Sequence, residues 1–382
     1  MNILFLMTSK YPTHKAYGVT TGETARALRE IGNNVKILSF SGSSASTIKD
    51  QYDNEVTIEF VKQSKFFQSV FSRIRFTGPL FFTCRSILVS LRSTRFIRAS
   101  DSEVIWTRDV FSALMLMLRS KGLFYVIELH HFPGSLKRLV LKLIMSHHQV
   151  LTLAIQKSMH KKLAAEFPKD KVLLAPMGVN PSFLARGESK LRKRSVTPAP
   201  RPLKVCFLGR ATSSDMSNGI EQLLEIWQNV PSALAELTII GLTAKDLNKS
   251  FGSRIHTGVS YIDQVPHSDV PDKLTQFDCG IIPYPDSLYN SERFPIKALE
   301  YCAVGLNLIL TETRAHRELV DEQIGYFYHP NNPISLEQTL VEISSNQDVA
   351  LRKAEEGHRW AQGYTYISRI NEAMKTLKEF QV

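Results

Sequence analysis

The sequence has few of the features that carry a chain out of the cytoplasm or through a membrane. No basic stretch precedes the short apolar run at residues 2–8, so we interpret this run as a buried strand rather than as a signal peptide. No uncharged apolar run approaches the roughly 20 residues that a membrane-spanning helix needs, and VFSALMLML at 110–118 is too short. We therefore expect a cytoplasmic protein.

Cysteine is also scarce, and none of the four cysteines has the spacing of a metal site or a redox pair. Cys206 and Cys279 lie inside apolar runs that are typical of buried strands. This usage indicates thiols that serve as small core residues in a reducing compartment. The sequence has no Asp-x-Asp motif either, a motif that would have suggested a bound metal.

Acidic residues are missing from one long segment, Val61 to Ser100, which carries a large share of the net charge of +11. Its bases are Lys62, Lys65, Arg73, Arg75, Arg85, Arg92, Arg95 and Arg98, interleaved with seven phenylalanines. A basic excess favours anionic partners, and bases on one face with aromatics on the other favour an anionic membrane surface. LKRLVLKLIM at 136–145 is a second basic amphipathic stretch. The alternative is that the phenylalanines belong to the core and the arginines are solvated.

Short β-branched runs alternate with longer helical patterns along the chain, which predicts βαβ units and parallel sheets. The pattern stops at residues 181–202, a polar, basic stretch rich in Pro and Ser that we predict to be a linker, and then restarts. The predicted strands are 2–8, 35–40, 55–61, 103–107, 123–129, 150–154 and 172–176, followed by 203–209, 236–241, 278–284, 306–311 and 325–329. We therefore expect an α/β protein with two doubly wound domains and a helical tail.

The residues after the predicted strand 278–284 carry the strongest functional signal. Pro295 suits the first turn of a helix and Gly305 suits its end. Glu300 is an isolated acid in the otherwise apolar part of that helix, and Glu292 lies just upstream. Because helix N-termini bind phosphate and ligands bind beyond the carboxyl ends of parallel strands, two carboxylates surround a predicted anion site.

This arrangement resembles the E-x7-E signature of the retaining GT-B glycosyltransferases of family 4. Glu292 and Glu300 are separated by seven residues and Phe294 stands two after the first; Gly305 and residues 316–320 also fit. The resemblance implies that Glu292 is catalytic, near the reacting carbon of the transferred sugar, and that Glu300 binds the ribose. It also implies that Phe294, Pro295 and Ile296 place the helix N-terminus at the donor diphosphate.

Other segments resemble the same family along nearly the whole chain. Arg210, after the strand 203–209, would contact the donor diphosphate, and Ile262, in the segment 261–266, would contact the nucleotide base. APMGVN at 175–180 resembles the turn before the family's linker, and 360–377 resembles its terminal helices. The implied fold has two Rossmann-like domains facing a cleft, with a C-terminal helix that crosses back to the N-terminal domain.

We accordingly predict an acceptor-binding domain at 1–180, the linker, a nucleotide-sugar-binding domain at 203–362 and a crossing helix at 363–382. In the first domain, Gly18 resembles part of the family's glycine-rich loop, although Val19 stands where a second glycine is usual. His130, two residues after Glu128, resembles the histidine near the reacting sugar. Adjacent histidines point in opposite directions from an extended chain, which argues against a metal site at His130 and His131.

One departure concerns the diphosphate. The family usually has a Lys-Gly pair where this chain has Asn218-Gly219, and we hypothesise that Lys297 supplies the missing positive charge. For all these residues an ordinary structural role is the alternative: a surface position for Arg210, a simple turn for Gly18 and a solvated helix face for Lys297 and Glu300.

The resemblance implies retaining transfer of a hexosyl group from a UDP- or GDP-sugar, with no metal or other cofactor. The acceptor would be a saccharide, in particular a lipid-linked one used in cell-surface polysaccharide synthesis, on the inner face of the cell membrane. Three alternatives stay open: a nucleotide-sugar epimerase of similar architecture, a non-catalytic sugar-binding relative and a nucleic-acid-binding protein. No nucleic-acid motif supports the last of these, and we expect no nucleic-acid partner.

Overall fold

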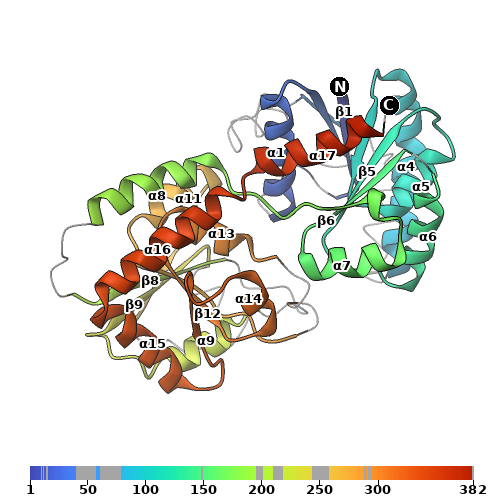
Figure 1. Ribbon diagram of the computed structural model, residues 1–382. Coiled ribbons are helices and arrows are strands. Elements are labelled where there is room, and N and C mark those ends of the chain that lie inside the picture. The colour runs from blue at the N-terminus through green and yellow to red at the C-terminus, as the bar shows by residue number, and fades with distance from the viewer. Residues whose placement is uncertain are drawn as a thin grey trace. The chain divides into compact units, whose positions relative to one another are not determined.

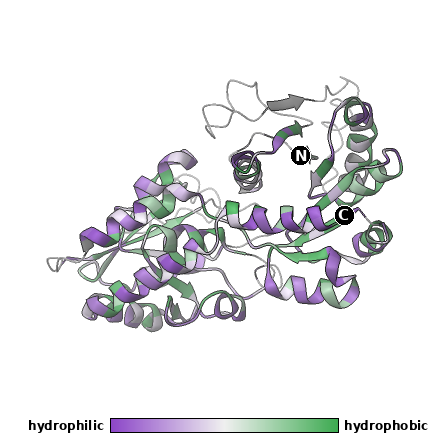
Figure 2. Cartoon of the chain, turned by 45° about the horizontal axis from the view of Figure 1, so that its top comes forward, coloured by the Kyte–Doolittle hydropathy of each residue, from purple (hydrophilic) through white to green (hydrophobic). Residues whose placement is uncertain are grey.

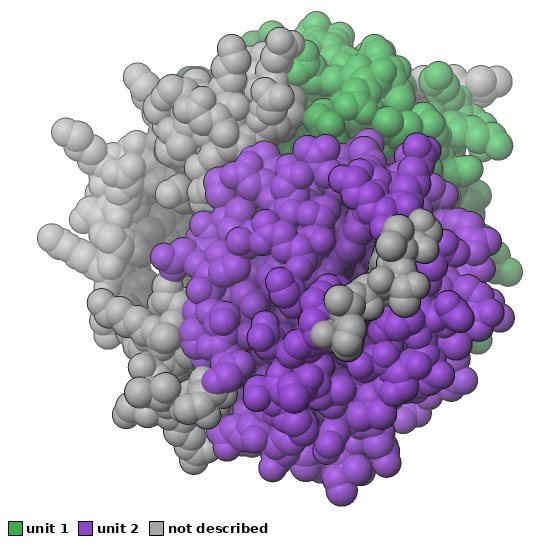
Figure 3. All heavy atoms as spheres, turned by 90° about the vertical axis from the view of Figure 1, so that its left-hand side faces the viewer, with its two compact units in different colours: residues 1–177, 366–382 green, residues 178–365 purple. Residues whose placement is uncertain are grey.

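The computed structural model describes most of the chain. The described residues are 1–9, 11, 13, 16–39, 57–60, 79–147, 149–194, 201–209, 218–242, 258–287, 290 and 294–380; at 57–60, 79–82, 84–85 and 194 only the backbone is described. The chain divides into two compact units, unit 1 with residues 1–177 and 366–382 and unit 2 with residues 178–365 (green and purple in Figure 3).

Unit 1 is built on a parallel sheet of seven strands in the order β3-β2-β1-β4-β5-β6-β7. The strands are β1 Asn2–Met7, β2 Asn34–Ser39, β3 Thr57–Phe60, β4 Val104–Thr107, β5 Phe124–Leu129, β6 Val150–Ala154 and β7 Val172–Leu174. Central strands such as β4 and β5 are buried at every position, as expected for strands covered on both faces. All seven strands lie within one residue of a predicted strand or inside it.

Helices cover both faces of this sheet. They are α1 Ala16–Glu30, α4 Pro79–Ala99, α5 Val110–Met117, α6 Ser135–Met145, α7 Lys157–Glu166 and α17 Tyr366–Glu379, with a 3-10 turn at Lys169–Lys171. α4 packs on α5 and α5 on α6, whereas α1 packs on α17, the last helix of the chain (Figure 1). The predicted return of the C-terminal helix to the N-terminal domain is therefore confirmed.

Unit 2 repeats the design with six parallel strands in the order β10-β9-β8-β11-β12-β13. They are β8 Leu203–Leu208, β9 Ala235–Ile240, β10 Val259–Ile262, β11 Cys279–Ile282, β12 Asn307–Thr311 and β13 Gly325–Tyr328. Five of them were predicted, and β10 was missed because only four residues pair and none of them is fully buried. In Figure 2 the strands carry the hydrophobic colour, while the helices carry most of the hydrophilic colour.

The helices of unit 2 are α8 Pro181–Arg194, α9 Ile220–Trp227, α11 Val270–Leu274, α13 Ile296–Ala303, α14 Arg314–Leu319, α15 Pro333–Ser345 and α16 Gln347–Gln362, with a 3-10 turn at His267–Asp269. α8, α13 and α16 pack on one another, and α15 packs on α9. The helical tail breaks at Gly363, the C-cap of α16, which is also the first residue of the predicted crossing helix.

The predicted linker at 181–202 is wrong for its first part, because residues 181–194 form α8. This helix buries Phe183 and Gly187, four residues apart, under a mostly basic and polar surface that hides the periodicity. A Cβ on Gly187 would lie 1.9 Å from the carbonyl oxygen of Ala303, so glycine is what allows α8 to approach α13 so closely. The segment is therefore part of the packing of unit 2.

No helix among the described residues is long and apolar enough to cross a bilayer. The described part of the basic segment 61–100 is α4, whose buried face is unusually polar. Three of its hydroxyl side chains, Ser90, Ser93 and Thr94, each donate a hydrogen bond to the carbonyl four residues earlier. Residues 61–78, which contain most of the phenylalanines of the predicted membrane surface, lie outside the described residues.

Candidate functional site

At the carboxyl edge of the unit 2 sheet, glycines bring backbone segments close together. Gly219 precedes α9 with a φ of +70°, and a Cβ there would lie 1.6 Å from the carbonyl oxygen of Pro283. Gly241 follows β9 with a φ of +96°, and its Cβ would lie 2.9 Å from the carbonyl oxygen of Gly209. Glycine alone suits both positions, so backbone rather than side chains lines this part of the edge.

Helix α13 is held over this edge by Tyr301. Its ring covers Gly280 of β11, where a Cβ would lie 2.3 Å from Cγ of the ring. Its hydroxyl oxygen accepts a hydrogen bond of 2.7 Å from the backbone N–H of Leu208, the last residue of β8. Pro295 is the N-cap and makes no side-chain cap bond, so within the described residues the start of α13 has no side-chain cap and keeps the partial positive charge of a helix N-terminus.

Lys297 projects from the first turn of α13 to the end of β8. Its Nζ lies 3.2 Å from the hydroxyl oxygen of Tyr284, 5.5 Å from the centroid of that ring and 5.0 Å from the ring centroid of Phe207. A Cβ on Gly209 would lie 2.8 Å from Nζ. Within the described part of the chain its partners are thus a hydroxyl and two ring faces, with no carboxylate, which leaves the ammonium able to bind an anion.

Glu300 lies one turn further along α13 and is 8% exposed. Its Oε1 is 3.4 Å from Nε2 of His267, whose ring packs on Phe183 of α8 with 5.6 Å between the ring centroids. This contact is long for a hydrogen bond between an imidazole and a carboxylate. The carboxylate is therefore oriented but far from saturated.

The other predicted donor-binding residues differ in burial, and some of them lie outside the described residues. Phe294 is buried against Tyr364, with 6.4 Å between the ring centroids, and Ile296 is half-buried at the start of α13. Ile262 ends β10, and its carbonyl oxygen already accepts the N–H of Gly241 at 2.9 Å. Glu292 and Arg210 lie outside the described residues, so the structure places only the second glutamate of the E-x7-E pair.

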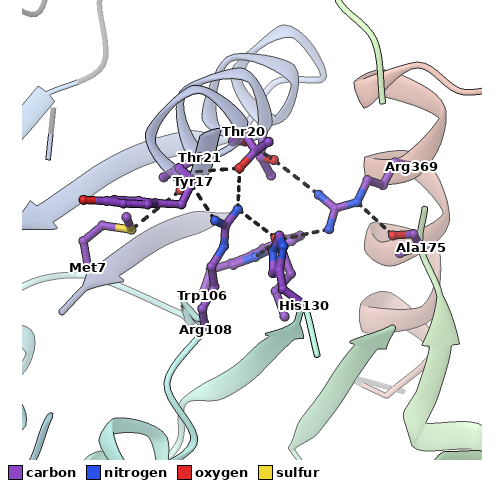
Figure 4. A network of polar contacts seen from close by, with 11 residues as sticks. Met7, Tyr17, Thr20, Thr21, Trp106, Arg108, His130, Ala175 and Arg369 are labelled. Carbon is purple, nitrogen blue, oxygen red and sulfur yellow. Dashed lines mark hydrogen bonds and ion pairs between the residues drawn. The ribbon is translucent and has the colours of Figure 1, made fainter. Parts of the chain in front are cut away.

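Unit 1 has its own polar centre, which we call the Glu128 network (Figure 4). Glu128, near the end of β5, is 1% exposed. Its Oε1 lies 2.8 Å from Nη2 of Arg108 and 2.5 Å from Nε2 of His130. Its Oε2 accepts a hydrogen bond of 3.2 Å from Nε1 of Trp106 and lies 2.9 Å from Nη2 of Arg369 as an ion pair. These five residues make up the network.

The two arginines join the network to segments far apart in the sequence. Arg108 also donates to the hydroxyl of Thr20 at 2.8 Å and to the carbonyl of Tyr17 at 3.3 Å, both in α1. Arg369, in α17, donates to the carbonyl of Ala175 at 3.2 Å and to the hydroxyl of Thr24 at 3.3 Å. The network thus fastens the first and last helices of the chain to the end of β5.

Charge and burial set the protonation of the network. Burial alone would raise the pKa of Glu128, but Arg108, Arg369 and the hydrogen bond from His130 together hold it well below its ordinary value. Burial and then Arg108 lower the pKa of His130 to about 4, against the opposing pull of Glu128. At neutral pH the network therefore holds a carboxylate, two guanidinium groups and a neutral imidazole. Since a carboxylate only accepts, we infer that the imidazole proton is on Nε2 and that Nδ1 is an acceptor.

The predicted loop at residues 17–19 is wrong, because α1 begins at Ala16 and Gly18 lies in its first turn. A Cβ on Gly18 would lie 2.3 Å from the carbonyl oxygen of Thr13, so this glycine is required by close packing of the preceding segment. The role predicted for Gly18 at the donor phosphates stays a prediction.

Sequence reasoning missed three members of the network: Trp106, Arg108 and Arg369. Arg108 directly follows β4, where the rule that ligands lie beyond strand ends could have singled it out. Arg369 occupies a buried position in α17 beside Tyr366, Ile370 and Ala373. A charged residue on the apolar stripe of an amphipathic helix is a signal for a buried partner.

The family of the chain is indicated by its second half. Residues 202–346 match the family model described as glycosyl transferases group 1. This segment is therefore similar to the glycosyl transferases group 1. It contains the Lys297 and Glu300 site, and it confirms the resemblance drawn from the sequence. No curated protein has a significantly similar sequence.

Solved glycosyltransferases share the fold of the whole chain. A glycosyltransferase from Rickettsia africae ESF-5 is similar with 16% identity and a TM-score of 0.70, over 100% of this chain and 98% of that one. Anabaena Alr3699/HepE, in complex with UDP and glucose, has 14% identity and a TM-score of 0.72, over 98% of this chain and 99% of that one. Sucrose-phosphate synthase from Thermosynechococcus elongatus has 13% identity and a TM-score of 0.72, over 99% and 98%.

At such identities the likeness shows the fold, which is the GT-B fold. Together with the family match it identifies the chain as a glycosyltransferase.

Proposed function

We propose that this glycosyltransferase transfers a hexose from a nucleoside diphosphate sugar, with UDP or GDP as the nucleotide, to a saccharide acceptor with retention of configuration. The observation that carries the proposal is that α13 presents both a cation, Lys297, and a carboxylate, Glu300. Both lie within the segment that matches the glycosyltransferase family. A cation suits a diphosphate and a carboxylate suits a ribose diol, and one helix presents both at the carboxyl edge of the sheet.

In this proposal the charge that develops on the leaving diphosphate is stabilised by preorganised donors. Lys297 and the uncapped N–H groups at the start of α13, near Pro295 and Ile296, are the donors that the described residues offer. Arg210 is proposed to add a guanidinium and Glu292 to act at the transferred sugar, both by resemblance to the family. The described residues hold no cluster of His, Cys, Asp or Glu side chains that could bind a metal ion. We propose a reaction without metal, which a chelator should leave unchanged.

His130 is proposed to contact the transferred sugar or the acceptor. Its pKa of about 4 keeps the ring neutral, and with Nε2 donating to Glu128 the inferred tautomer presents Nδ1 as an acceptor. The ring is fixed by the Glu128 network, so it would meet a sugar hydroxyl in one orientation. A hydroxyl that donates its proton to Nδ1 is the contact that this geometry favours.

The acceptor is proposed to be a lipid-linked saccharide at the cytoplasmic face of a membrane, in cell-surface polysaccharide synthesis. Support comes from the charge distribution of unit 1, where basic stretches favour an anionic surface. For the donor, the Anabaena protein of the same fold was solved with UDP and glucose, which makes UDP-glucose the first compound to test.

A thermal-shift panel of UDP, GDP, ADP and CMP, with UDP- and GDP-sugars, tests the donor site. A ligand that binds only the folded state raises the midpoint according to RT ln(1 + [L]/Kd). A rise with UDP or GDP and the matching sugars supports the proposal and identifies the base. Equal midpoints with all of them would contradict it. With an acceptor in hand, the anomeric configuration of the product, read by NMR, tests retention.

A further inference from the structure

A stripe of three exposed leucines runs along α6, and we call it the leucine stripe. Leu136, Leu139 and Leu143 are 61%, 59% and 58% exposed. They are spaced by three and four residues, so they share one face of the helix. The opposite face is the one that packs into unit 1, with Val140, Leu141, Ile144 and Met145 buried. Helix α6 is therefore apolar on two faces, and only one of them is used by the fold.

The stripe is a local concentration of exposed apolar surface. Single exposed leucines are common, but several on one face mark an interaction site. Leu118, at the end of the neighbouring α5, is 72% exposed as well. Among the described residues, only two other large apolar side chains are classed as exposed, Ile334 and Val341, and both belong to α15 in unit 2.

The charge of α6 itself is positive, and one of its cations, Arg138, is paired with Glu166 of α7 at 3.2 Å. α6 has no acidic residue, and Lys137, Arg138 and Lys142 are its charged side chains. Arg138 and Lys162 lie over the ring of Phe132, at 5.7 Å and 5.3 Å from its centroid.

The C-terminal end of α6 carries a further cation. Lys171 donates hydrogen bonds of 2.8 Å to the carbonyls of Met145 and His147. An occupant of this face must therefore combine an apolar body with an anionic surface.

We propose that α6 is a membrane-contact helix that binds an anionic bilayer. The leucine stripe would lie between the lipid headgroups, and Lys137 and Lys142 of α6 would contact the lipid phosphates. The helix has 11 residues, about 16 Å at 1.5 Å per residue, which is too short to cross a bilayer and suits a helix lying in the interface. Lys137 and Lys142 are exposed, and side chains of their length and flexibility can reach headgroup charges from outside the stripe. From the sequence we predicted the main membrane surface at residues 61–100, and α6 corresponds to the second basic amphipathic stretch noted at 136–145.

One consequence rests on the proposed function. Four residues separate His130 from Ser135, the first residue of α6. A bilayer bound to α6 would hold the His130 loop close to the lipid surface, where the saccharide of a lipid-linked acceptor begins. Membrane binding by α6 itself does not depend on that function.

The test is co-sedimentation of the full chain with vesicles of phosphatidylcholine, with and without phosphatidylglycerol. We expect binding to the anionic vesicles, at least about tenfold weaker for the variant Leu139→Ser/Leu143→Ser. A second variant, Lys137→Gln/Lys142→Gln, should lose the preference for anionic lipid. The control, Ile334→Ser/Val341→Ser, removes exposed apolar surface from unit 2 and should bind as the wild type does.

Failure of the wild type to sediment with anionic vesicles overturns the proposal, and so does equal binding by the leucine variant. If instead the wild type elutes as a dimer and the leucine variant as a monomer, the stripe is a subunit interface and the proposal is equally overturned. The nucleotide thermal shift is measured on the same proteins. A shift without vesicle binding refutes only the membrane-contact helix, whereas vesicle binding without any nucleotide shift refutes only the donor site.

Discussion

Two buried carboxylates, Glu128 in unit 1 and Glu300 in unit 2, lie near the carboxyl edges of similar sheets but differ in how well they are satisfied. Glu128 has four partners within 3.2 Å, two of them arginines. Glu300 has, within the described part of the chain, a single polar partner, His267 at 3.4 Å. The comparison indicates a division of labour. A saturated carboxylate holds the fold together, whereas an unsaturated one keeps capacity for a ligand.

The largest expected effect is the loss of the charge of Glu128. Glu128→Gln keeps the shape of the side chain but leaves the buried guanidinium of Arg369 and the half-buried one of Arg108 without their anion. Breaking a buried pair in this way typically costs about 3–5 kcal/mol. We expect unit 1 to lose about that much stability. Amide hydrogen exchange in β5 and α17 should become faster in the variant than in the wild type, whereas exchange in the strands of unit 2 should stay unchanged.

The matched control for this variant is Glu166→Gln. Glu166 pairs with Arg138 at 3.2 Å, but both side chains are about 40% exposed, at 42% and 39%. An exposed pair contributes at most about 1 kcal/mol. If Glu128→Gln were no more destabilising than this control, the Glu128 network would not be what holds α17 to unit 1.

The next effect concerns the unsaturated site. Lys297→Ala removes the ammonium at the end of β8, and a hydrogen bond to a charged group contributes about 1.5–3 kcal/mol. We therefore expect the dissociation constant of the donor nucleotide to rise by roughly tenfold to a hundredfold, with the melting temperature little changed. Lys204→Ala, at the exposed opposite end of the same strand, is the control and should bind as the wild type does. Equal affinities of the two variants would return Lys297 to the role of a solvated helix residue.

Much of the fold could be predicted because strands of a buried parallel sheet are apolar on both faces and therefore appear in the sequence as continuous apolar runs. All strands except β10 were found, and β10 pairs through four residues that are only partly buried or exposed. α8 was missed because a helix that buries only a few positions, such as Phe183 and Gly187, has no strong apolar period. Gly187 acts through the space it leaves for Ala303, which no sequence pattern reveals.

The candidate site was predictable only where it is local. Glu300 was singled out by its spacing from Glu292, and Lys297 by its place in the first turn of the same helix, both through the resemblance to the family. The Glu128 network joins Arg108 and Arg369, which are 261 positions apart by their residue numbers, and only the folded chain brings them together. How many partners the Glu128 carboxylate has depends on distances between residues that only the folded structure gives.

A smaller effect is the dependence of the stability of unit 1 on pH. His130 has a folded pKa of about 4 against an ordinary value of 6.5, so between these values the unfolded chain takes up a proton that the folded chain does not. This lowers the stability of unit 1 as the pH falls from 6.5 towards 4. Glu128, with its pKa held below the ordinary value, loses its contribution at still lower pH.

The variant His130→Gln should flatten the loss between pH 6.5 and 5, followed by hydrogen exchange in β5. His329→Gln, at an exposed position of unit 2, is its control and should leave the pH dependence of β5 as it is in the wild type. A wild-type slope that persists in His130→Gln would show that another group of unit 1 is responsible.

The smallest expected effect is that of one hydrogen bond that supports the unsaturated site. Tyr301→Phe removes the acceptor for the backbone N–H of Leu208, and a lost hydrogen bond of this kind costs about 1 kcal/mol. Because that bond joins α13 to the end of β8, where Lys297 lies, we expect a small loss of donor affinity together with the loss of stability. Tyr125→Phe is the matched control, since the buried hydroxyl of Tyr125 has no hydrogen-bond partner among the described residues and its removal should be neutral or stabilising. Should Tyr301→Phe lose stability but bind the donor with unchanged affinity, the position of α13 on β8 would matter to the fold alone, and the contrast between the two carboxylates would rest on Lys297 and Glu300 themselves.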